Sequence, residues 1–273
     1  MQNKTTLFLG VALLAVVVVG GGWWAYDFVQ GDTAAPSGPI TAIPIAVNTV
    51  PAPTEAPIQV NQPAPSEAQA TAIPTSAPVE PIATTAVAAI SESGLVIFQI
   101  SQAESEASFS IFEELNGQPK TVVGATDQVA GQVALDMNDL TKTQVGVIQV
   151  NARALVTDND RRNRAIRNFI LQTDQYEFIT FTPTAITGLN GPAQPGQPFT
   201  FQIAGDLTIR NVTQPAVFEV TVQGESATRL TGTATTVVRR SDYKLTIPSV
   251  PNVANVGEEV TIEIDIVAEA ASS

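Results

Sequence analysis

The sequence predicts an all-β domain over residues 94–273, built as an antiparallel barrel or sandwich of about eight strands. Short runs alternate apolar and polar residues, as in PFTFQIAGDLTIR from Pro198 and EVTIEIDIVAEA from Glu259. This two-residue alternation is typical of sheets that have one dry and one wet face. Glycines such as Gly117 and Gly188 fall between the runs, where turns require them.

The inward faces of these runs combine bulky and small residues. Phe201, Phe218 and Ile264 are bulky, whereas Ala154 and Ala234 are small. A barrel of about eight strands is either filled by its own side chains or wide enough for one small ligand. Small inward residues favour a pocket. The alternative is a closed, filled core, in which the alternation serves folding only.

The composition removes most familiar classes of enzyme. The chain has 273 residues, no cysteine, no histidine and a formal net charge of -13 at pH 7. Without cysteine there are no disulfides or thiol nucleophiles, and without histidine the commonest general base and metal ligand is missing. The acidic balance disfavours nucleic acid, because a phosphate backbone requires clustered positive charge. We therefore expect a protein that is not an enzyme, uses no cofactor or metal and binds no nucleic acid.

The N-terminal residues 1–30 predict a membrane anchor. Lys4 precedes an uncharged, largely apolar run over residues 5–26, and Trp23 and Trp24 lie at its end. About 20 such residues cross a bilayer as a helix, and tryptophan is enriched at the interface. The positive-inside rule then predicts a single-pass protein with a cytoplasmic N-terminus and an extracytoplasmic C-terminal domain. A cleaved signal peptide is the competing interpretation, although no small-residue cleavage motif directly follows the run.

Residues 31–93 predict a linker between this anchor and the β-rich domain. They are rich in proline, alanine, threonine and serine and show no sustained period. Proline fixes φ and removes a hydrogen-bond donor, so such a segment favours an extended, polyproline-like chain. The composition therefore predicts a disordered stalk that holds the domain away from the bilayer.

The stretch TDNDRRNRAIRNFIL departs from the strand pattern and predicts a short helix near 159–171. Apolar residues from Ala165 to Ile170 recur at helical spacing, and Arg162 falls on the same face. A guanidinium on an apolar face needs an anion. The expected partner is an internal carboxylate such as Asp136 or Asp206. The alternatives are the phosphate or carboxylate head group of a ligand, or a helix whose boundaries differ from these.

Six segments of the β-rich zone carry a further pattern, and they follow one another in the order SQAESEASFSI, VAGQVALD, NARALVTDNDRRNRAIRNFI, YEFITFTPTAI, GDLTIRNVTQPAVFEV and RRSDYKL. Together they resemble the YceI family, the lipid/polyisoprenoid-binding-like domain of bacterial envelopes, over about residues 95–270. The resemblance implies a lipocalin-like antiparallel β-barrel. It also implies an association with long isoprenoid or amphiphilic lipids.

The chain departs from the family pattern at several positions. Ala165 stands where many members have histidine, and Asn163 stands where many have aspartate. Asn211 and Lys244 replace glycines of the family pattern. The loss of the histidine weakens any polar or metal-dependent role that this position carries in other members.

The strand faces and the resemblance together give a set of candidate ligand-binding residues that face the lumen. Their expected role is to bury the tail of a polyisoprenoid-like or other amphiphilic lipid, which needs few polar contacts. We expect an envelope-anchored carrier or sequestering module, and the alternative is a structural or interaction module with a filled barrel, displayed on a stalk. The candidates are Phe109, Ile148, Val150, Ala152, Ala154, Arg162, Phe169, Tyr176, Phe181, Phe201, Ile203, Leu207, Phe218, Ala234 and Ile264.

Overall fold

A computed structural model of the chain describes residues 34–45, 95–194 and 196–271. The expected anchor over residues 1–30 lies outside the described residues, as does most of the expected linker. Within the described ranges, no helix has both the length and the apolar character needed to span a bilayer.

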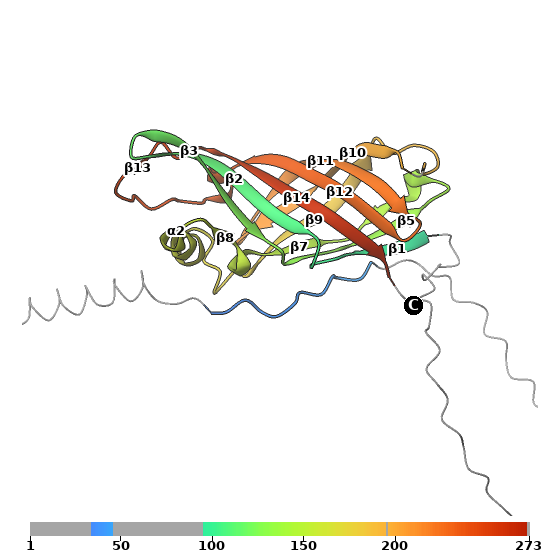
Figure 1. The fold of residues 1–273 in the computed structure, drawn as a ribbon, viewed down its shortest axis with the longest axis horizontal. Coiled ribbons are helices and arrows are strands. Elements are labelled where there is room, and N and C mark those ends of the chain that lie inside the picture. Colours follow the sequence, from blue (N-terminus) through green and yellow to red (C-terminus); the bar gives the residue numbers. More distant parts are fainter. Residues whose placement is uncertain (1–33, 46–94, 195, 272–273) are drawn as a thin grey trace, which may run out of the picture.

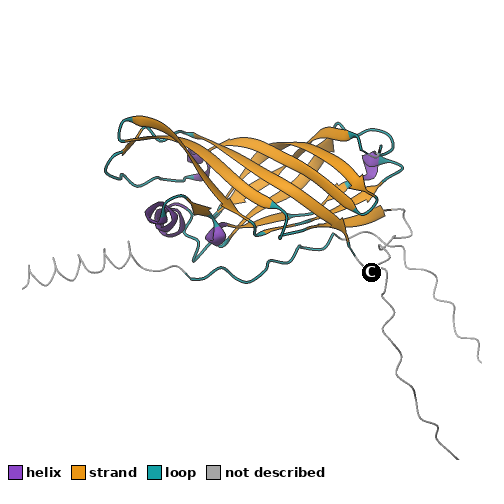
Figure 2. Ribbon diagram, viewed as in Figure 1, coloured by secondary structure: helices purple, strands orange, loops and turns teal. Residues whose placement is uncertain are grey.

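The strands form one antiparallel sheet that curls around an apolar interior, and helix α2 lies at one end of it (Figures 1 and 2). Hydrogen-bonded neighbours follow the order β4-β7-β9-β10-β11-β12-β14-β1-β5-β6, while β2 pairs with β14, β3 and β13, and β8 pairs with β3. In chain order the elements are β1 (Leu95–Ile100), β2 (Glu106–Leu115), β3 (Gln118–Thr126), β4 (Val129–Ala130), β5 (Gln132–Asp136), η1 (Leu140–Lys142), β6 (Gln144–Val145), β7 (Ile148–Asn151), η2 (Ala152–Ala154), β8 (Val156–Thr157), α2 (Asp160–Ala165), η3 (Ile166–Ile170), β9 (Phe178–Thr187), β10 (Pro198–Ile209), β11 (Val212–Ser226), β12 (Arg229–Arg239), η4 (Arg240–Tyr243), β13 (Val253–Ala254) and β14 (Glu259–Ala270).

The two ends of the main strand path approach each other at a glycine. Gly131 alone separates β4, which pairs with β7, from β5, which pairs with β1. A Cβ atom on Gly131 would collide with the side chain of Ile148 and would lie 3.2 Å from the Cδ1 atom of Ile100. Glycine therefore permits the close approach that the curl of the sheet requires.

The structure confirms the predicted all-β, antiparallel fold and the short helix near 159–171. The expected number of about eight strands differs from the fourteen strand segments that the described part of the sheet contains. Interruptions account for the difference, because they divide long strands into shorter segments. The first part of β14 pairs with β2 and its end pairs with β1, and the turn at residues 101–105 separates these two partners.

Helix α2 begins at an asparagine cap and continues into the π-helical turn η3. The side chain of Asn159 accepts hydrogen bonds from the backbone N–H groups of Arg161 and Arg162, as an N-cap residue does. The backbone N–H of Leu171 donates to the carbonyl of Ile166 at 2.8 Å, which is the i→i+5 pattern of a π-helix. The helix therefore changes its winding at Ile166.

Residues 34–45 lie along the outside of the curled sheet, although they fall within the range predicted as a disordered linker (Figure 1). Ile40 and Ala42 are buried against Ala130 of β4 and Phe178 of β9. Ser37 donates to the Glu177 carboxylate through its backbone N–H at 2.7 Å and through its hydroxyl at 2.6 Å. These contacts place residues 34–45 against β4 and β9, a packing that composition alone does not reveal.

Candidate functional site

The interior of the curled sheet holds two apolar cavities. The larger has a volume of about 470 Å³ and the smaller about 260 Å³. Ligand pockets in proteins span about 300–1,000 Å³, so the larger cavity falls within this range and the smaller lies just below it. Inward-facing residues of the long strands β9, β10, β11, β12 and β14 contribute to their walls.

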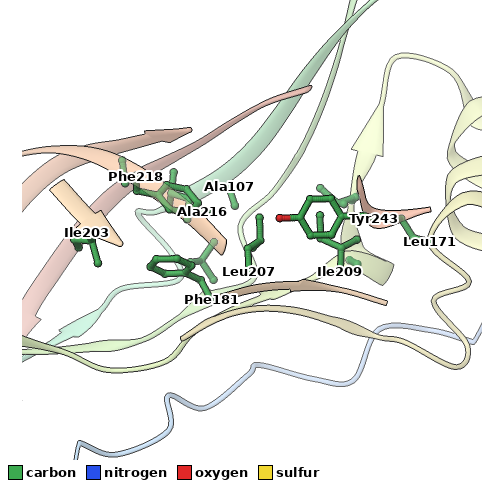
Figure 3. Close-up of a cluster of buried hydrophobic side chains, with 14 of the residues drawn as sticks. Ala107, Leu171, Phe181, Ile203, Leu207, Ile209, Ala216, Phe218 and Tyr243 are labelled. Carbon is green, nitrogen blue, oxygen red and sulfur yellow. The ribbon is translucent and has the colours of Figure 1, made fainter. Parts of the chain in front are cut away.

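Four side chains from four different strands line both cavities and form the wall between them. They are Ile148 of β7, Phe181 of β9, Phe218 of β11 and Ile264 of β14. The rings of Phe181 and Phe218 meet edge to face, with centroids 4.8 Å apart and an interplanar angle of 63°, which is a favoured aromatic geometry. Figure 3 shows both rings between Ile203 on one side and Leu207 on the other. We call these four side chains the dividing wall.

The position of Phe181 in the dividing wall depends on a glycine in the neighbouring strand. The pairing of β10 with β9 shifts register between Ala204 and Gly205. A Cβ atom on Gly205 would lie 2.6 Å from the Cζ atom of Phe181 and 2.5 Å from the carbonyl oxygen of Thr182. Because Gly205 has no side chain, the Phe181 ring lies directly against the backbone of β10.

The smaller cavity has an almost wholly apolar lining. Phe201, Ile203 and Ala234 face it, as the alternation of β10 and β12 predicts. Met137 and Leu230 also line it, and the sequence analysis did not include them. Its few polar side chains, such as Thr143 and Gln194, carry no charge. This cavity therefore suits a hydrocarbon segment without a charged group.

The larger cavity is mostly apolar, but charged side chains also border it, among them Arg162 of α2. Arg162, Lys120 and Arg240 all border it. Each has an acidic partner: Arg162 Nη2 lies 2.8 Å from Glu113 Oε1, Lys120 Nζ lies 2.7 Å from Asp158 Oδ2, and Arg240 Nη2 lies 3.1 Å from Glu258 Oε2. The lining therefore changes from apolar near the dividing wall to paired charges near α2.

The charge on Arg162 is balanced by Glu113 of β2 and by Asp158. The carboxylate of Glu113 is buried, with a side-chain exposure of 7%. The hydrogen bond from Lys120 lowers the pKa of Asp158, and the charge of Arg162 adds to this effect. The predicted internal ion pair is thus present, but Asp136 and Asp206 are the wrong partners, since Asp136 pairs with Lys142 instead.

Removing one partner of the ion pair between Arg162 and Glu113 is expected to destabilise the protein. Arg162→Met leaves the Glu113 carboxylate buried without a partner, so we expect the free energy of unfolding to fall by about 3 kcal/mol. The double variant Arg162→Met with Glu113→Leu removes both charges and should return to within about 1 kcal/mol of the unchanged protein. Urea denaturation measures the free energy of unfolding of both variants. A single variant no less stable than the double variant would contradict the buried pair.

Tyr243 lies at the wall of the larger cavity and is 2% exposed. The 3₁₀ turn η4 places its ring, and Lys244 follows with a positive φ of 55°. This left-handed conformation is the reason that glycine suits position 244. Burial raises the pKa of the Tyr243 hydroxyl to about 12, and the charge of Asp242 adds to this effect. The phenol is therefore protonated at neutral pH.

Most of the predicted ligand-binding residues line one or both cavities. They are Phe109, Ile148, Val150, Arg162, Phe181, Phe201, Ile203, Leu207, Phe218, Ala234 and Ile264. The alternation of the strands identified the apolar members of this set because the period of two is a local property of extended chain.

Four predicted residues line neither cavity. Ala152 and Ala154 lie in the 3₁₀ turn η2, because β7 ends at Asn151, whose side chain accepts a hydrogen bond from the backbone N–H of Arg153. Phe169 lies in the π-helical turn η3, whose winding differs from that of the regular α-helix assumed for it. Tyr176 precedes β9, and its ring centroid lies 5.9 Å from the guanidinium of Arg210.

The residues that the sequence analysis missed at the larger cavity come from three places. Ile166 and Ile170 project from the α2–η3 segment, Tyr243 projects from η4, and Val250 and Val253 belong to the long connection before β14. The helical spacing marks Ile166 and Ile170 as apolar positions of one face, whereas the connection has no alternation and η4 has no helical period, so no sequence pattern marks Tyr243, Val250 and Val253. The described residues contain no group of three or more acidic side chains that could hold a metal ion.

The comparison with protein families identifies the class of this domain. The model of the YceI-like domain matches residues 98–268. The chain therefore belongs to the YceI-like domain family. A comparison with curated proteins gives no match.

Several solved structures resemble this chain. One is a polyisoprenoid binding domain from Saccharophagus degradans implicated in plant cell wall breakdown, with 16% identity, a TM-score of 0.50 and coverage of 65% of this chain and 99% of that one. BcnA from Burkholderia cenocepacia has 19% identity, a TM-score of 0.49 and coverage of 62% and 98%. The YCEI protein of Campylobacter jejuni has 15% identity, a TM-score of 0.42 and coverage of 55% and 85%. The first of these supports the curled antiparallel fold.

Proposed function

We propose that this domain binds the tail of a long apolar lipid, polyisoprenoid-like or otherwise amphiphilic, inside its curled sheet. In this proposal it is a non-enzymatic carrier or sequestering module of the cell envelope. The observation that carries the proposal is the pair of apolar cavities inside the sheet, both of which are lined by the side chains of the dividing wall. The membership of the YceI-like family supports it.

The chemistry of the lining matches an amphiphile better than a plain hydrocarbon. The smaller cavity and the region of the dividing wall are apolar, whereas paired charges border the larger cavity near α2. A tail that loses about 200 Å² of apolar surface to such a lining gains about 5 kcal/mol. Part of this is offset by the ordering of a flexible chain. The head group is then expected near α2 and the tail toward the smaller cavity.

The cavities also weigh against the alternative function, a display module with a filled interior. A filled barrel has no space beside inward residues such as Phe201 and Ala234, and here both of these face the smaller cavity. The inward-facing apolar residues therefore line open space as well as stabilising the sheet. We retain the carrier or sequestering module as the proposed function.

The position of residues 34–45 supports an arrangement at the membrane. The backbone N–H of Ala34 donates to Asp174 at 3.1 Å, and Asp174 lies close in sequence to Leu171, which lines the larger cavity. Ala34 thus lies beside the segment that follows α2 and η3. If the preceding segment is the single-pass anchor that its composition predicts, the charged end of the larger cavity faces the extracytoplasmic surface of the bilayer. A lipid then has a short path between the membrane and the cavity.

Native mass spectrometry of the full chain tests the proposed function. The protein is purified in detergent from a lipid-rich host, and the detergent is removed in the gas phase. We expect retained lipid of a defined mass, and after delipidation we expect uptake of an added polyprenol. The absence of both retained lipid and polyprenol uptake would argue against a lipid-binding function.

A further inference from the structure

The hydroxyl group of Tyr243 is buried without a hydrogen-bond partner among the described residues, and the Tyr243 side chain lines the larger cavity. Figure 3 shows it pointing toward Leu207, with Ile209 beside the ring and Leu171 on the far side of it. Leu207, Ile209 and Leu171 are all buried apolar residues. The polar end of this side chain therefore faces an apolar surface.

The ring of Tyr243 is held in this position by the backbone around η4. The backbone N–H of Leu245 donates to the carbonyl of Arg240 at 3.0 Å, and that of Lys244 donates to the carbonyl of Ser241 at 2.9 Å. The side chain of Gln214 donates to the carbonyl of Asp242 at 3.1 Å. These bonds fix the turn, so the hydroxyl does not reach solvent without breaking them.

A buried hydroxyl without a partner is unfavourable, and such groups in proteins are normally satisfied by a ligand or by ordered water. A phenol with its ordinary pKa of about 10 is protonated at neutral pH, and burial raises the pKa of Tyr243 further, so the group available to a partner is an O–H donor. The partner that fits is an uncharged acceptor oxygen, because the surrounding side chains are apolar and a charged group would be desolvated without compensation.

We propose that the Tyr243 hydroxyl donates a hydrogen bond to an uncharged oxygen of the bound amphiphile. This inference rests on the proposed function and adds the chemical class of the ligand: a long apolar chain with an alcohol, ether, ester or carbonyl oxygen near its head. With that oxygen at Tyr243, the chain runs past Leu207 to Phe181 and Phe218 of the dividing wall (Figure 3). Tyr243 then selects oxygen-bearing lipids over hydrocarbons.

The test compares two probes that differ only in the acceptor oxygen. Geranylgeraniol and the hydrocarbon that lacks its hydroxyl are titrated by native mass spectrometry into the delipidated full chain and into Tyr243→Phe. We expect the unchanged protein to prefer the alcohol, and the variant to bind the alcohol roughly threefold to tenfold more weakly. Binding of the hydrocarbon should be the same in both proteins. Tyr176→Phe is the matched control, because Tyr176 lines neither cavity, and it should leave both affinities unchanged.

The outcomes separate this inference from the function on which it rests. If Tyr243→Phe binds both probes more weakly by the same factor, or binds both as tightly as the unchanged protein does, the role of the hydroxyl is overturned. Its hydrogen bond is then assigned to water. Failure of the unchanged protein to bind either probe, or any polyprenol, would overturn the lipid-binding function itself. The thermal unfolding midpoint of the ligand-free variant should be unchanged or raised, because the variant loses an unsatisfied polar group and no packing. A lowered midpoint would show that the hydroxyl has a partner within the protein and would also overturn the inference.

Discussion

Replacing Phe181 with alanine is expected to join the two cavities into one and to lower the free energy of unfolding by about 3 kcal/mol. Phe181 is 6% exposed and packs edge to face against Phe218 in the dividing wall. This loss of stability lies at the lower end of the range measured when a buried phenylalanine is replaced with alanine, because the Phe181 ring already borders open space on two sides. With the wall opened, the domain should retain longer prenyl chains than before.

A series of polyprenols of increasing length measures this change by native mass spectrometry, and urea denaturation measures the stability. Phe112→Ala is the matched control, because Phe112 of β2 is 43% exposed and should alter neither property by a measurable amount. If Phe181→Ala retains the same longest chain as the unchanged protein, Phe181 does not limit the length of the bound tail.

Replacing Ala234 with phenylalanine is expected to fill the smaller cavity and to prevent the binding of long tails. Ala234 of β12 is 7% exposed, faces the smaller cavity and pairs across the sheet with Ile264 of the dividing wall. Overpacking a filled core typically costs about 1–3 kcal/mol. Here the added ring enters existing space, so the free energy of unfolding should change by less than about 1 kcal/mol.

Val237→Phe controls for the added ring, because Val237 lies on the same strand and is 57% exposed. Only Ala234→Phe should lose long polyprenols, while short chains that fit the larger cavity remain bound in both variants. Severe destabilisation by Ala234→Phe would contradict an open cavity at this position. Unchanged retention of long chains would show that the smaller cavity does not hold the tail.

The fold and most of the inner lining could be predicted from the sequence because both depend on a local period. Phe201, Ile203 and Leu207 lie at odd-numbered positions on one face of β10, with Gly205 between the last two, and each of the three faces a cavity. The dividing wall could not be predicted in the same way. It arises where Phe181 and Phe218 from different strands meet, and this depends on the register of several strand pairs.

The errors at other positions have local causes that the alternation does not reveal. Asn151 ends β7 by capping the turn η2, so the two alanines that follow leave the strand face. Phe169 lies in the π-helical turn η3, and it lines neither cavity. The carboxylate that pairs with Arg162 belongs to Glu113 of β2, which is distant in sequence. The sequence contains many acidic residues, and no local pattern indicates which of them folding brings close to Arg162.

An experimental density map of the full chain, purified from a lipid-rich host, tests the central claim most directly. The account predicts elongated density that begins beside Tyr243, passes Leu207 and ends at or beyond Phe181. Side chains of the protein that occupy both cavities, with no space left for a ligand, would contradict it.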